Sequence, residues 1–588
     1  MRPTKFRALL IIAAMVSGAL ALAPAHAAGR ITETGYITLP DQVTLKYTAV
    51  FPDDGAAHPT LFEYSGYNPG SIPDQAYINE YVPEGYAFIG VNIRGTGCSG
   101  GTLDFFEPQE ARDGAFVIDN FLQTRTWSNG DVAMIGKSYP GITQLFVAEE
   151  QPTHLKAIAP GHFYGDIYRD VAFPGGIFNY AFAGLWSFIA QPSPGYQSAA
   201  SAIAAGDKTC AANVAQHTAT NAQYNAFIQA QQHPYDDALT QERSPETLVD
   251  NIAVPLFTAV AWQDEQVGPR EAEMIAKLRC PHWAILTNGD HGMYRTATSL
   301  AMLHEFFDHF LKGVENRFSA SDPNRYQPIT YWWEAGRDSA RAPGWTTSGK
   351  EFPPTASALR LFLASGSKLA PASEETSSAD VYAYPGGSQS IANPYYASTS
   401  LPNQYMWANK PAPGMAVSYT SEPFAQNTTL LGTGSVDLTF ASSAPDTDIE
   451  IVLTEIRPDG QEQYIQKGWL RASHRKLDAA LSRELRPYMT HKAEDATLLT
   501  PGETTTLRVE IDPFGQVIRA GSRVRLWIEA PNAEPELWGF ASLPTPATNF
   551  VYHGSPTPSS LVLPVVPSIS APDYPVCGSL IRQPCRPA

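Results

Sequence analysis

The chain has 588 residues and a formal net charge of −18 at pH 7, with 43% hydrophobic, 11% aromatic and 17% charged residues. This composition is that of a globular protein of two or three domains, and it excludes collagen-like and low-complexity chains. The acidic balance argues against binding to nucleic acid or to an anionic membrane surface, because like charges repel.

The first 27 residues have the pattern of a secretory signal peptide. Arg2, Lys5 and Arg7 give a basic start, residues 8–22 form an apolar run, and small residues precede a cleavage site at Ala27. We find no other apolar run in the sequence that is long enough to cross a bilayer. We therefore expect an exported, soluble protein without a membrane span, secreted or periplasmic after cleavage near Ala27.

Short apolar runs alternate with helical segments between residues 28 and 164. Strand patterns occupy residues 31–39, 43–50, 59–64, 86–93, 131–136 and 155–159, and a helix pattern covers residues 109–123. Strands that alternate with helices predict an α/β layer on a mostly parallel sheet. The same layer resumes over residues 247–345, with strand patterns at 254–261 and 282–287 and an amphipathic helix at 299–312.

Two further regions depart from this alternation. Residues 165–246 carry aromatic and Ala-rich stretches without a strand pattern, which predicts a helical cap inserted into the α/β layer. Residues 346–588 instead carry runs that alternate with a period of two, as at 359–363, 436–440, 449–453, 507–511 and 524–528. These runs predict a C-terminal β-sandwich of the jelly-roll type.

Residues 131–141 are the segment around which the candidate chemistry is organised. An apolar run ends at Gly136, Ser138 follows two residues later, and a helix pattern comes next. A serine between a strand and a helix is the arrangement of the nucleophile elbow, whose usual pattern is G-x-S-x-G. Here Pro140 stands at the place of the second glycine, and Gly141 follows it. The segment predicts Ser138 as a nucleophile.

A serine hydroxyl needs a basic histidine, and the histidine needs a carboxylate that orients it. In an α/β-hydrolase these residues follow the serine in the order acid, then histidine, each in a loop after a strand. Asp264 and His291 occupy such loops and are predicted to complete the triad. Glu265 is the second choice for the acid. Asp290 is less suitable because it adjoins the histidine.

Two other motifs are weaker indications. Residues 95–100 match the dinucleotide pattern G-x-G-x-x-G, but a loop pattern rather than a helix follows them. His304 and His309 resemble the ligand pair of a metal helix, but they are five residues apart and lie on different helix faces. We therefore expect neither a nucleotide site nor a metal site, and the serine chemistry requires no cofactor.

Five cysteines in an exported chain allow two disulfides and one free thiol. Cys577 and Cys585 lie close together in the irregular C-terminal tail, and we expect them to pair. Cys210 with Cys280 is the second expected pair, which leaves Cys98 free. A disulfide between Cys98 and one of the others remains the alternative.

The residues quoted above resemble those of the X-Pro dipeptidyl-peptidase family of serine hydrolases, which includes cocaine esterase and the α-amino-acid ester hydrolases. The matching motifs are GKSYPG at 136–141, NIRGTG at 92–97, DTD at 446–448 and GWLRAS at 468–473. The resemblance spans nearly the whole mature chain. It implies an oxyanion hole made by the Tyr139 N–H and by a tyrosine hydroxyl. The hydroxyl corresponds to Tyr67, with Tyr64 as the runner-up.

The resemblance is less informative about the substrate. α-Amino-acid ester hydrolases carry acids two and three places after the triad aspartate, where this chain has Gln266 and Val267. Glu265 and Asp170 are candidates to replace these acids. The aromatic candidates for an acyl pocket are Trp262, Phe178, Phe182 and Trp186, although each of them is at least as compatible with an ordinary core position.

Together these observations predict an exported serine hydrolase that cleaves small carboxylic esters, amides or short peptides through an acyl-enzyme. A second hypothesis is an exopeptidase that removes X-Pro dipeptides, or an α-amino-acid ester hydrolase, either of which needs an anionic site for a free amine. A third is a non-catalytic protein whose jelly roll binds carbohydrate. We expect no nucleic-acid partner, and a homo-oligomer is compatible with each hypothesis.

Overall fold

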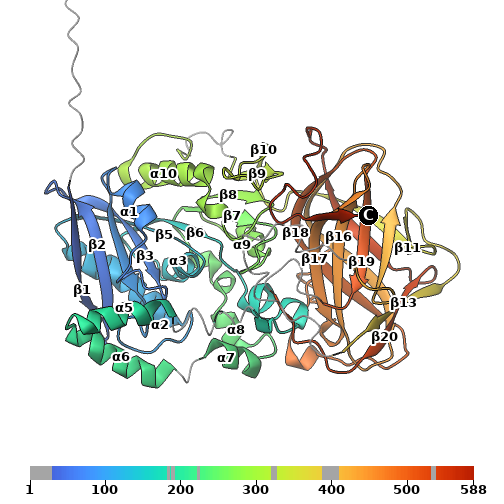
Figure 1. Ribbon diagram of the computed structural model, residues 1–588, viewed down its shortest axis with the longest axis horizontal. Helices are drawn as coiled ribbons and strands as arrows, with labels where there is room; N and C mark the ends of the chain where they lie inside the picture. Colours follow the sequence, from blue (N-terminus) through green and yellow to red (C-terminus); the bar gives the residue numbers. More distant parts are fainter. Residues whose placement is uncertain are drawn as a thin grey trace, which may run out of the picture.

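The computed structural model describes residues 29–181, 186, 193–221, 225–319, 327–386, 410–531 and 538–588, with residues 193–198 described by their backbone alone. The expected signal peptide and Phe182 lie outside the described residues. Figure 1 shows two bodies side by side, an α/β layer with its cap and a C-terminal body of strands. No helix in the described part of the chain is long and apolar enough to cross a membrane.

The α/β layer is built on a sheet of ten strands in the order β1-β2-β4-β3-β5-β6-β7-β8-β9-β10. The strands from β4 to β9 in this order run parallel, whereas β1, β2 and β10 pair antiparallel at the two edges. The strand bounds are β1 Arg30–Thr38, β2 Thr44–Pro52, β3 His58–Ser65, β4 Ala87–Asn92, β5 Ser128–Lys137, β6 Leu155–Gly161, β7 Leu256–Ala261, β8 His282–Thr287, β9 Ile329–Trp333 and β10 Trp345–Gly349.

Helices cover both faces of this sheet because its buried strands alternate their side chains between the two faces. On β5, Val132 and Met134 join a core with α2 and α3, whereas Ala133 and Ile135 join a core with α1 and α10. The helix bounds are α1 Gln75–Tyr81, α2 Pro108–Phe116, α3 Tyr139–Glu149, α9 Glu271–Ile275 and α10 Ala297–Lys312. A π-helical turn and a 3-10 turn continue α2 through Thr124.

The cap segment contains only helices and turns among its described residues, apart from an isolated bridge between Asn179 and Phe540. Its α-helices are α5 Ser193–Ala204, α6 Lys208–Asn221, α7 Ala226–Gln232 and α8 Ala238–Glu242, which lie along the lower side of the molecule in Figure 1. A π-helical turn at Tyr168–Ala172 leads into the segment.

The disulfides correct one of the two expected pairs. Cys577 pairs with Cys585 as expected, but Cys210 pairs with Cys98, and Cys280 is free and buried. The physical reason is the position of α6, which packs on the loop after β4. There the Asn213 amide donates to the Cys98 carbonyl over 2.8 Å. The prediction of Cys210 with Cys280 was therefore wrong, and the bond ties the cap to the α/β layer.

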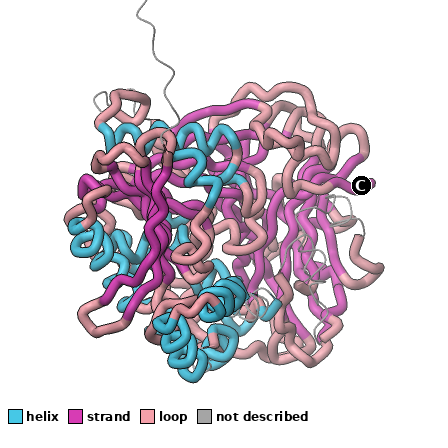
Figure 2. The backbone as a smooth tube through the Cα atoms, turned by 60° about the vertical axis from the view of Figure 1, so that its left-hand side comes forward, coloured by secondary structure: helices cyan, strands magenta, loops and turns pink. Residues whose placement is uncertain are grey.

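The C-terminal body consists of strands, as the colours of Figure 2 make plain. They are β11 Ser357–Ala364, β12 Lys368–Ala370, β13 Ser378–Tyr384, β14 Ala416–Ser421, β15 Thr428–Ser442, β16 Asp448–Ile456, β17 Gln461–Arg471, β18 Thr505–Ile518, β19 Arg523–Glu529, β20 Ala547–His553, β21 Ser560–Val566 and β22 Cys585–Pro587. One buried cluster receives side chains from every strand between β11 and β21, so the strands enclose a common core.

The expected fold class, an α/β-hydrolase layer with a C-terminal β-rich domain, is confirmed. The expected border after residue 345 falls within β10, which pairs with β9 along its whole length, so the first sheet extends to Gly349. The two bodies share a buried cluster in which Trp262 of the α/β layer meets Phe352 and Leu431.

Candidate active site

The turn at Ser138 joins β5 to α3. It holds the serine in a backbone conformation that residues other than glycine rarely adopt, with φ of 64° and ψ of −130°. Both neighbouring glycines are required by space. A Cβ on Gly136 would lie 2.6 Å from the Pro140 Cβ, and one on Gly141 would lie 2.4 Å from the Gly161 carbonyl oxygen of β6. The shifted second glycine therefore lets α3 approach β6 closely. Strain of this kind is typical of a nucleophile elbow.

Ser138 sits at the N-terminus of α3, where its own carbonyl accepts the N–H groups of Gly141 and Ile142. Its backbone N–H donates to the Gly161 carbonyl over 2.7 Å, which pins the turn to β6. Tyr139 contributes the first N–H of the helix, a position at which no partner within the helix exists. This N–H is therefore available to an oxyanion beside the serine.

His291 and Asp264 meet at the ends of β8 and β7. The His291 Nδ1 lies 2.8 Å from Asp264 Oδ2 and 3.1 Å from Oδ1. The other side of the carboxylate is held by the backbone, since Oδ1 accepts the N–H groups of Gln266 at 2.8 Å and Val267 at 3.1 Å. Gln266 and Val267, which stand where the α-amino-acid ester hydrolases carry acids, thus hold the candidate triad aspartate through their main chain.

The main chain of His291 is fixed as firmly as its ring. Lys137, which precedes the serine, donates its Nζ to the His291 carbonyl over 2.8 Å. The His291 N–H donates to Glu265 Oε2 over 3.1 Å. These contacts bring the loops after β5, β7 and β8 together, and with them Ser138, Asp264 and His291.

The electrostatics of the pair suit a neutral base. Burial opposes ionisation of Asp264, but the imidazoles beside it lower the pKa of the carboxyl well below its ordinary value. Burial lowers the pKa of His291 despite the favourable charge of Asp264. When Nδ1 keeps its proton and donates it in a hydrogen bond to Asp264, Nε2 carries the lone pair. This Nε2 is buried without a hydrogen-bond partner among the described residues. The ring can therefore take a proton from an attacking hydroxyl.

The two alternative acids serve other partners. Glu265 is fully buried, accepts the His291 N–H and lies 3.1 Å from the Arg582 guanidinium. Asp290 pairs with the Arg341 guanidinium through both of its oxygens. Asp264 is the acid that contacts the His291 ring.

Tyr67 follows β3 and presents its hydroxyl to the serine. The Trp186 Nε1–H donates to the Tyr67 oxygen over 3.0 Å, and the Ser138 side chain is a second hydrogen-bond partner of this hydroxyl. Burial raises the pKa of Tyr67, so the phenol keeps its proton and can donate it to an oxyanion. The alternative, Tyr64, points away and donates to the Glu110 carbonyl over 3.1 Å.

The loop that carries Tyr67 is held by Asn92, the last residue of β4. The Asn92 Oδ1 accepts the Gly70 N–H over 2.6 Å, and its Nδ2 donates to Asn68 Oδ1 over 2.6 Å. Next to the tyrosine, a Cβ on Gly66 would lie 2.5 Å from the Tyr139 ring. A glycine at this place thus makes room for the ring that packs edge-on against Tyr67.

An apolar cavity of about 110 Å³ opens beside Ser138. Its wall comes from the strand ends of the α/β layer and from the cap, and among the described residues that line it there is no Asp, Glu, Lys, Arg or His. The lining residues are Tyr67, Phe105, Phe106, Ser138, Tyr139, Ile142, Tyr164, Ile167, Val171, Ala172, Trp186, Ala226, Ala230 and Val267. Such a cavity suits a small uncharged acyl group.

None of the four candidate substrate-binding residues Trp262, Glu265, Asp170 and Phe178 lines this cavity. Trp262 is a core residue that packs on Phe352, and Phe178 packs between Phe173 and Phe227. Asp170 accepts the N–H groups of Gly165 and Asp166 and lies 3.1 Å from the Arg270 guanidinium. Glu265 is engaged as described above. Each of the four side chains thus has its contacts in the protein core or in an ion pair.

The cavity wall includes residues that the sequence analysis missed. Phe105 and Phe106 follow the glycine-rich loop after β4, Tyr164 follows β6, and Val267 follows Asp264. Each of them comes shortly after the carboxyl end of a strand, and this position is the signal that would have found them. Among the aromatic candidates that the structure describes, Trp186 does line the cavity.

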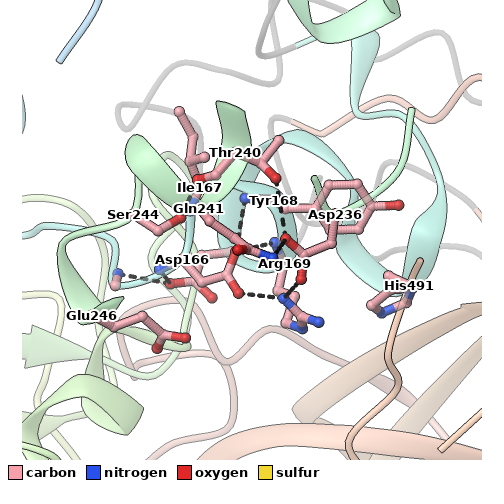
Figure 3. A network of polar contacts seen from close by, with 12 residues as sticks. Asp166, Ile167, Tyr168, Arg169, Asp236, Thr240, Gln241, Ser244, Glu246 and His491 are labelled. Carbon is pink, nitrogen blue, oxygen red and sulfur yellow. Dashed lines mark hydrogen bonds and ion pairs between the residues drawn. The ribbon is translucent and has the colours of Figure 1, made fainter. Parts of the chain in front are cut away.

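A buried ionic network supports the part of the wall that comes from residues 167–172 (Figure 3). The Arg169 NH1 donates to Asp166 over 2.6 Å and to Asp236 over 2.7 Å. Its NH2 donates to the carbonyls of Met489 and Thr490 in the C-terminal domain, each over 3.1 Å. One guanidinium thus joins the cavity wall, the cap and the β-rich domain.

His162, Asp264 and His291 are the one cluster in the described chain whose ligand atoms are close enough to hold a metal ion, all within 4.8 Å of one another. Both imidazoles turn Nδ1 toward Asp264 Oδ2 at 2.8 Å. This is the distance of an N–H···O hydrogen bond, so protons account for the cluster.

Comparison with known proteins agrees with this geometry. The model of the X-Pro dipeptidyl-peptidase (S15) family matches residues 41–293, and that of the X-Pro dipeptidyl-peptidase C-terminal non-catalytic domain matches residues 324–562. A Mycobacterium bovis protein described by name as a serine esterase is 25% identical over 553 residues, which cover 84% of this chain and 85% of the relative. Cocaine esterase from a Rhodococcus species is 24% identical over 543 residues, or 83% and 89% of the two chains. The fold is similar to that of a CocE/NonD family hydrolase from Staphylococcus aureus, with a TM-score of 0.73, 21% identity, and coverage of 91% of this chain and 94% of the other.

Proposed function

Since the chain belongs to the X-Pro dipeptidyl-peptidase (S15) family of serine hydrolases, we propose that it is an esterase for uncharged, apolar acyl groups, with Ser138, His291 and Asp264 as its triad. The observation that carries this proposal is the cavity beside Ser138, where the described wall residues carry no ionisable group other than tyrosine hydroxyls. A substrate with a free amine needs a carboxylate at this place, because a buried ammonium without a partner is strongly destabilised.

In the proposed reaction the Ser138 Oγ attacks the ester carbonyl carbon while His291 Nε2 takes its proton. Asp264, fixed by the backbone of Gln266 and Val267, stabilises the imidazolium that forms. The carbonyl oxygen becomes an oxyanion between the Tyr139 N–H and the Tyr67 hydroxyl, where one donor can contribute about 3 kcal/mol.

The imidazolium then gives its proton to the alcohol oxygen, which leaves as the C–O bond breaks. The acyl group stays on Ser138 with its apolar part in the cavity. A water molecule enters, His291 takes one of its protons, and the hydroxide adds to the acyl carbon. This second intermediate collapses as the bond between the acyl carbon and the Ser138 Oγ breaks, the Oγ takes the proton back from His291, and the acid is released.

One alternative is removal of X-Pro dipeptides, which the description of the matching family model favours, and another is hydrolysis of α-amino-acid esters. Both reactions require an acid that receives the substrate amine. Glu265 and Asp170 are already paired with Arg582 and Arg270. We therefore rank these activities second.

A matched pair of substrates tests the ranking. The 4-nitrophenyl ester of phenylacetic acid and that of phenylglycine differ by one α-amine, and Ala-Pro-4-nitroanilide reports X-Pro cleavage. We expect kcat/KM for the uncharged ester to exceed that for the amino ester by at least about tenfold, since a buried ammonium without a partner costs a kcal/mol or more. A higher value for the amino ester or for the nitroanilide would reverse the ranking.

We also propose that the protein acts outside the cytoplasm, after removal of the signal peptide near Ala27. The basic start and apolar run of the first 27 residues support this proposal. The disulfides Cys98–Cys210 and Cys577–Cys585 support it further, because such bonds persist mainly in oxidising compartments. Sequencing of the protein from its native host should give a mature N-terminus near Ala28, whereas an intact N-terminus on a cytoplasmic protein would contradict export.

A further inference from the structure

The carboxylate of Asp264 contacts a second imidazole, that of His162. The Asp264 Oδ2 lies 2.8 Å from His162 Nδ1 and 2.8 Å from His291 Nδ1. Both rings are buried, and their centroids are 4.9 Å apart. The triad aspartate thus serves two histidines at once, and the serine mechanism uses only one of them.

The neighbours of His162 fix which of its nitrogens carries a proton. The Tyr294 N–H donates to His162 Nε2 over 3.2 Å, and this contact requires a lone pair there. The proton must then lie on Nδ1, which faces Asp264 and, at 3.3 Å, Glu271 Oε1. Glu271 and Asp264 raise the pKa of His162 against the cost of burial, but a second proton would point at the Tyr294 N–H. In either charge state, the Nδ1 proton is shared between Glu271 and Asp264, whose Oδ2 lies 2.8 Å away.

The ring has little freedom to turn away from this contact. His162 follows β6, and Glu271 beside it accepts the backbone N–H groups of Ala261 at 3.0 Å and Phe163 at 3.1 Å. Tyr294, on the other side, donates its hydroxyl to the Ala159 carbonyl over 2.6 Å. His162 is therefore a rigid donor that joins the ends of β6, β7 and β8.

We propose that His162 is a positioning residue of the triad, which holds the Asp264 carboxylate in place and takes up part of its negative charge. This inference rests on the proposed function of the His291–Asp264 pair. Four N–H donors share the carboxylate, namely those of His291, His162, Gln266 and Val267. Because each donor stabilises part of the charge, less of it remains to stabilise a protonated His291.

The charged groups around His162 and His291 affect the pKa of each ring. His162 faces Asp264 and Glu271, while His291 faces Asp264, His162 and Lys137. Glu265 and Asp290 also act on Lys137, and Arg582 neutralises Glu265. Removal of the His162 donor leaves more of the Asp264 charge for His291. The imidazolium becomes more stable, and His291 is then protonated, and inactive as a base, at a higher pH than in the wild type.

The test is the pH dependence of the rate at which a fluorophosphonate labels Ser138, which requires no knowledge of the natural substrate. For His162→Leu we expect the acid limb to move to higher pH by about half to one unit. In His162→Asn the amide nitrogen takes the place of Nδ1, so the limb should return to within about 0.2 units of the wild type. His58→Asn, at the opposite end of the sheet, controls for the loss of a buried histidine and should leave the limb unmoved.

The outcomes separate this inference from the proposed function. If the wild type is not labelled, the proposed triad fails. If it is labelled and His162→Leu lowers only the maximal rate, with the acid limb unmoved, then His162 is merely structural and the inference is overturned. Should His162→Leu fail to fold, His162→Gln replaces it, because its amide nitrogen lies at the position of Nε2 rather than Nδ1. The Gln variant should then show the shift, and coincident limbs for Asn and Gln would contradict the proposal.

Discussion

The proposed catalytic centre and the cavity beside it are held together by different kinds of contact. Directed hydrogen bonds of about 3 Å position the His291 base. They engage the Asp264 carboxylate oxygens, the His291 Nδ1 proton and the His291 main chain. The cavity wall is instead made of rings and aliphatic side chains from distant parts of the chain. For the proposed esterase, this difference means that the geometry of the reaction is fixed tightly, whereas the choice of acyl group depends on the shape and the apolar character of the cavity.

The largest expected effect comes from the tautomer of His291. In Asp264→Asn the amide can donate to Nδ1, which would move the ring proton to Nε2 and remove the base. We expect kcat to fall by about 10⁴-fold with little change in KM. Asp290→Asn is the matched control, since that acid pairs with Arg341 and not with the ring. A loss of similar size in both variants would mean that the acid has been assigned wrongly.

The next effect tests the oxyanion hole. Tyr67→Phe removes one donor and should lower kcat by about 10²–10³-fold. Trp186→Phe keeps the tyrosine hydroxyl but loses the N–H that orients it and part of a ring that lines the cavity, so kcat should fall markedly less than in Tyr67→Phe. Steady-state kinetics on a 4-nitrophenyl ester measure both variants. Equal losses, or a change in KM alone, would remove Tyr67 from the oxyanion hole.

A negative charge placed in the cavity wall should change the preference for uncharged acyl groups. Val267 lines the cavity and is the third residue after Asp264. In Val267→Asp we expect the ratio of kcat/KM for the phenylglycine ester to that for the phenylacetate ester to rise by about tenfold. Val267→Asn has the same shape without the charge and should leave the ratio near that of the wild type. An unchanged ratio in the Asp variant would show that the amine does not reach this wall.

The sequence-based predictions were strongest where local pattern and chain order sufficed. The elbow at Ser138, the order of Asp264 and His291, and the two kinds of domain follow from periodicity and from strand-end loops. The whole cavity could not be predicted in this way, because Val171, Ala226 and Ala230 join its wall only after the cap has packed. The wrong Cys210–Cys280 pair has the same cause, since it depends on where α6 lies.

The partners of charged residues could not be predicted for a related reason. Glu265 and Asp170 are candidates to replace the amine-binding acids, and the arginines that pair with them are far away in the sequence. Arg582 comes from the C-terminal tail, and Arg270 from the segment before α9. The sequence alone does not show whether a buried acid is paired with a distant arginine. The position of His162 beside Asp264 is hidden in the same way.

The smallest expected effect concerns the pH dependence of the wild-type activity. His291 must be neutral to act as a base, so activity is present above its pKa and is lost as the pH falls through it. Because burial lowers this pKa, the acid limb of kcat/KM should lie below the ordinary histidine value of 6.5. Initial rates between about pH 4 and 8 measure it. A limb above pH 6.5 would contradict the described environment of the ring.

The central claim is that Ser138 is the nucleophile of a working triad, and covalent labelling tests it most directly. A fluorophosphonate should add to the native protein, and mass spectrometry of its peptides should locate the adduct on Ser138. Ser138→Ala should remain unlabelled, while Ser348→Ala, an exposed serine on β10, should be labelled like the wild type. An adduct on another residue, or labelling that persists in Ser138→Ala, would contradict the claim.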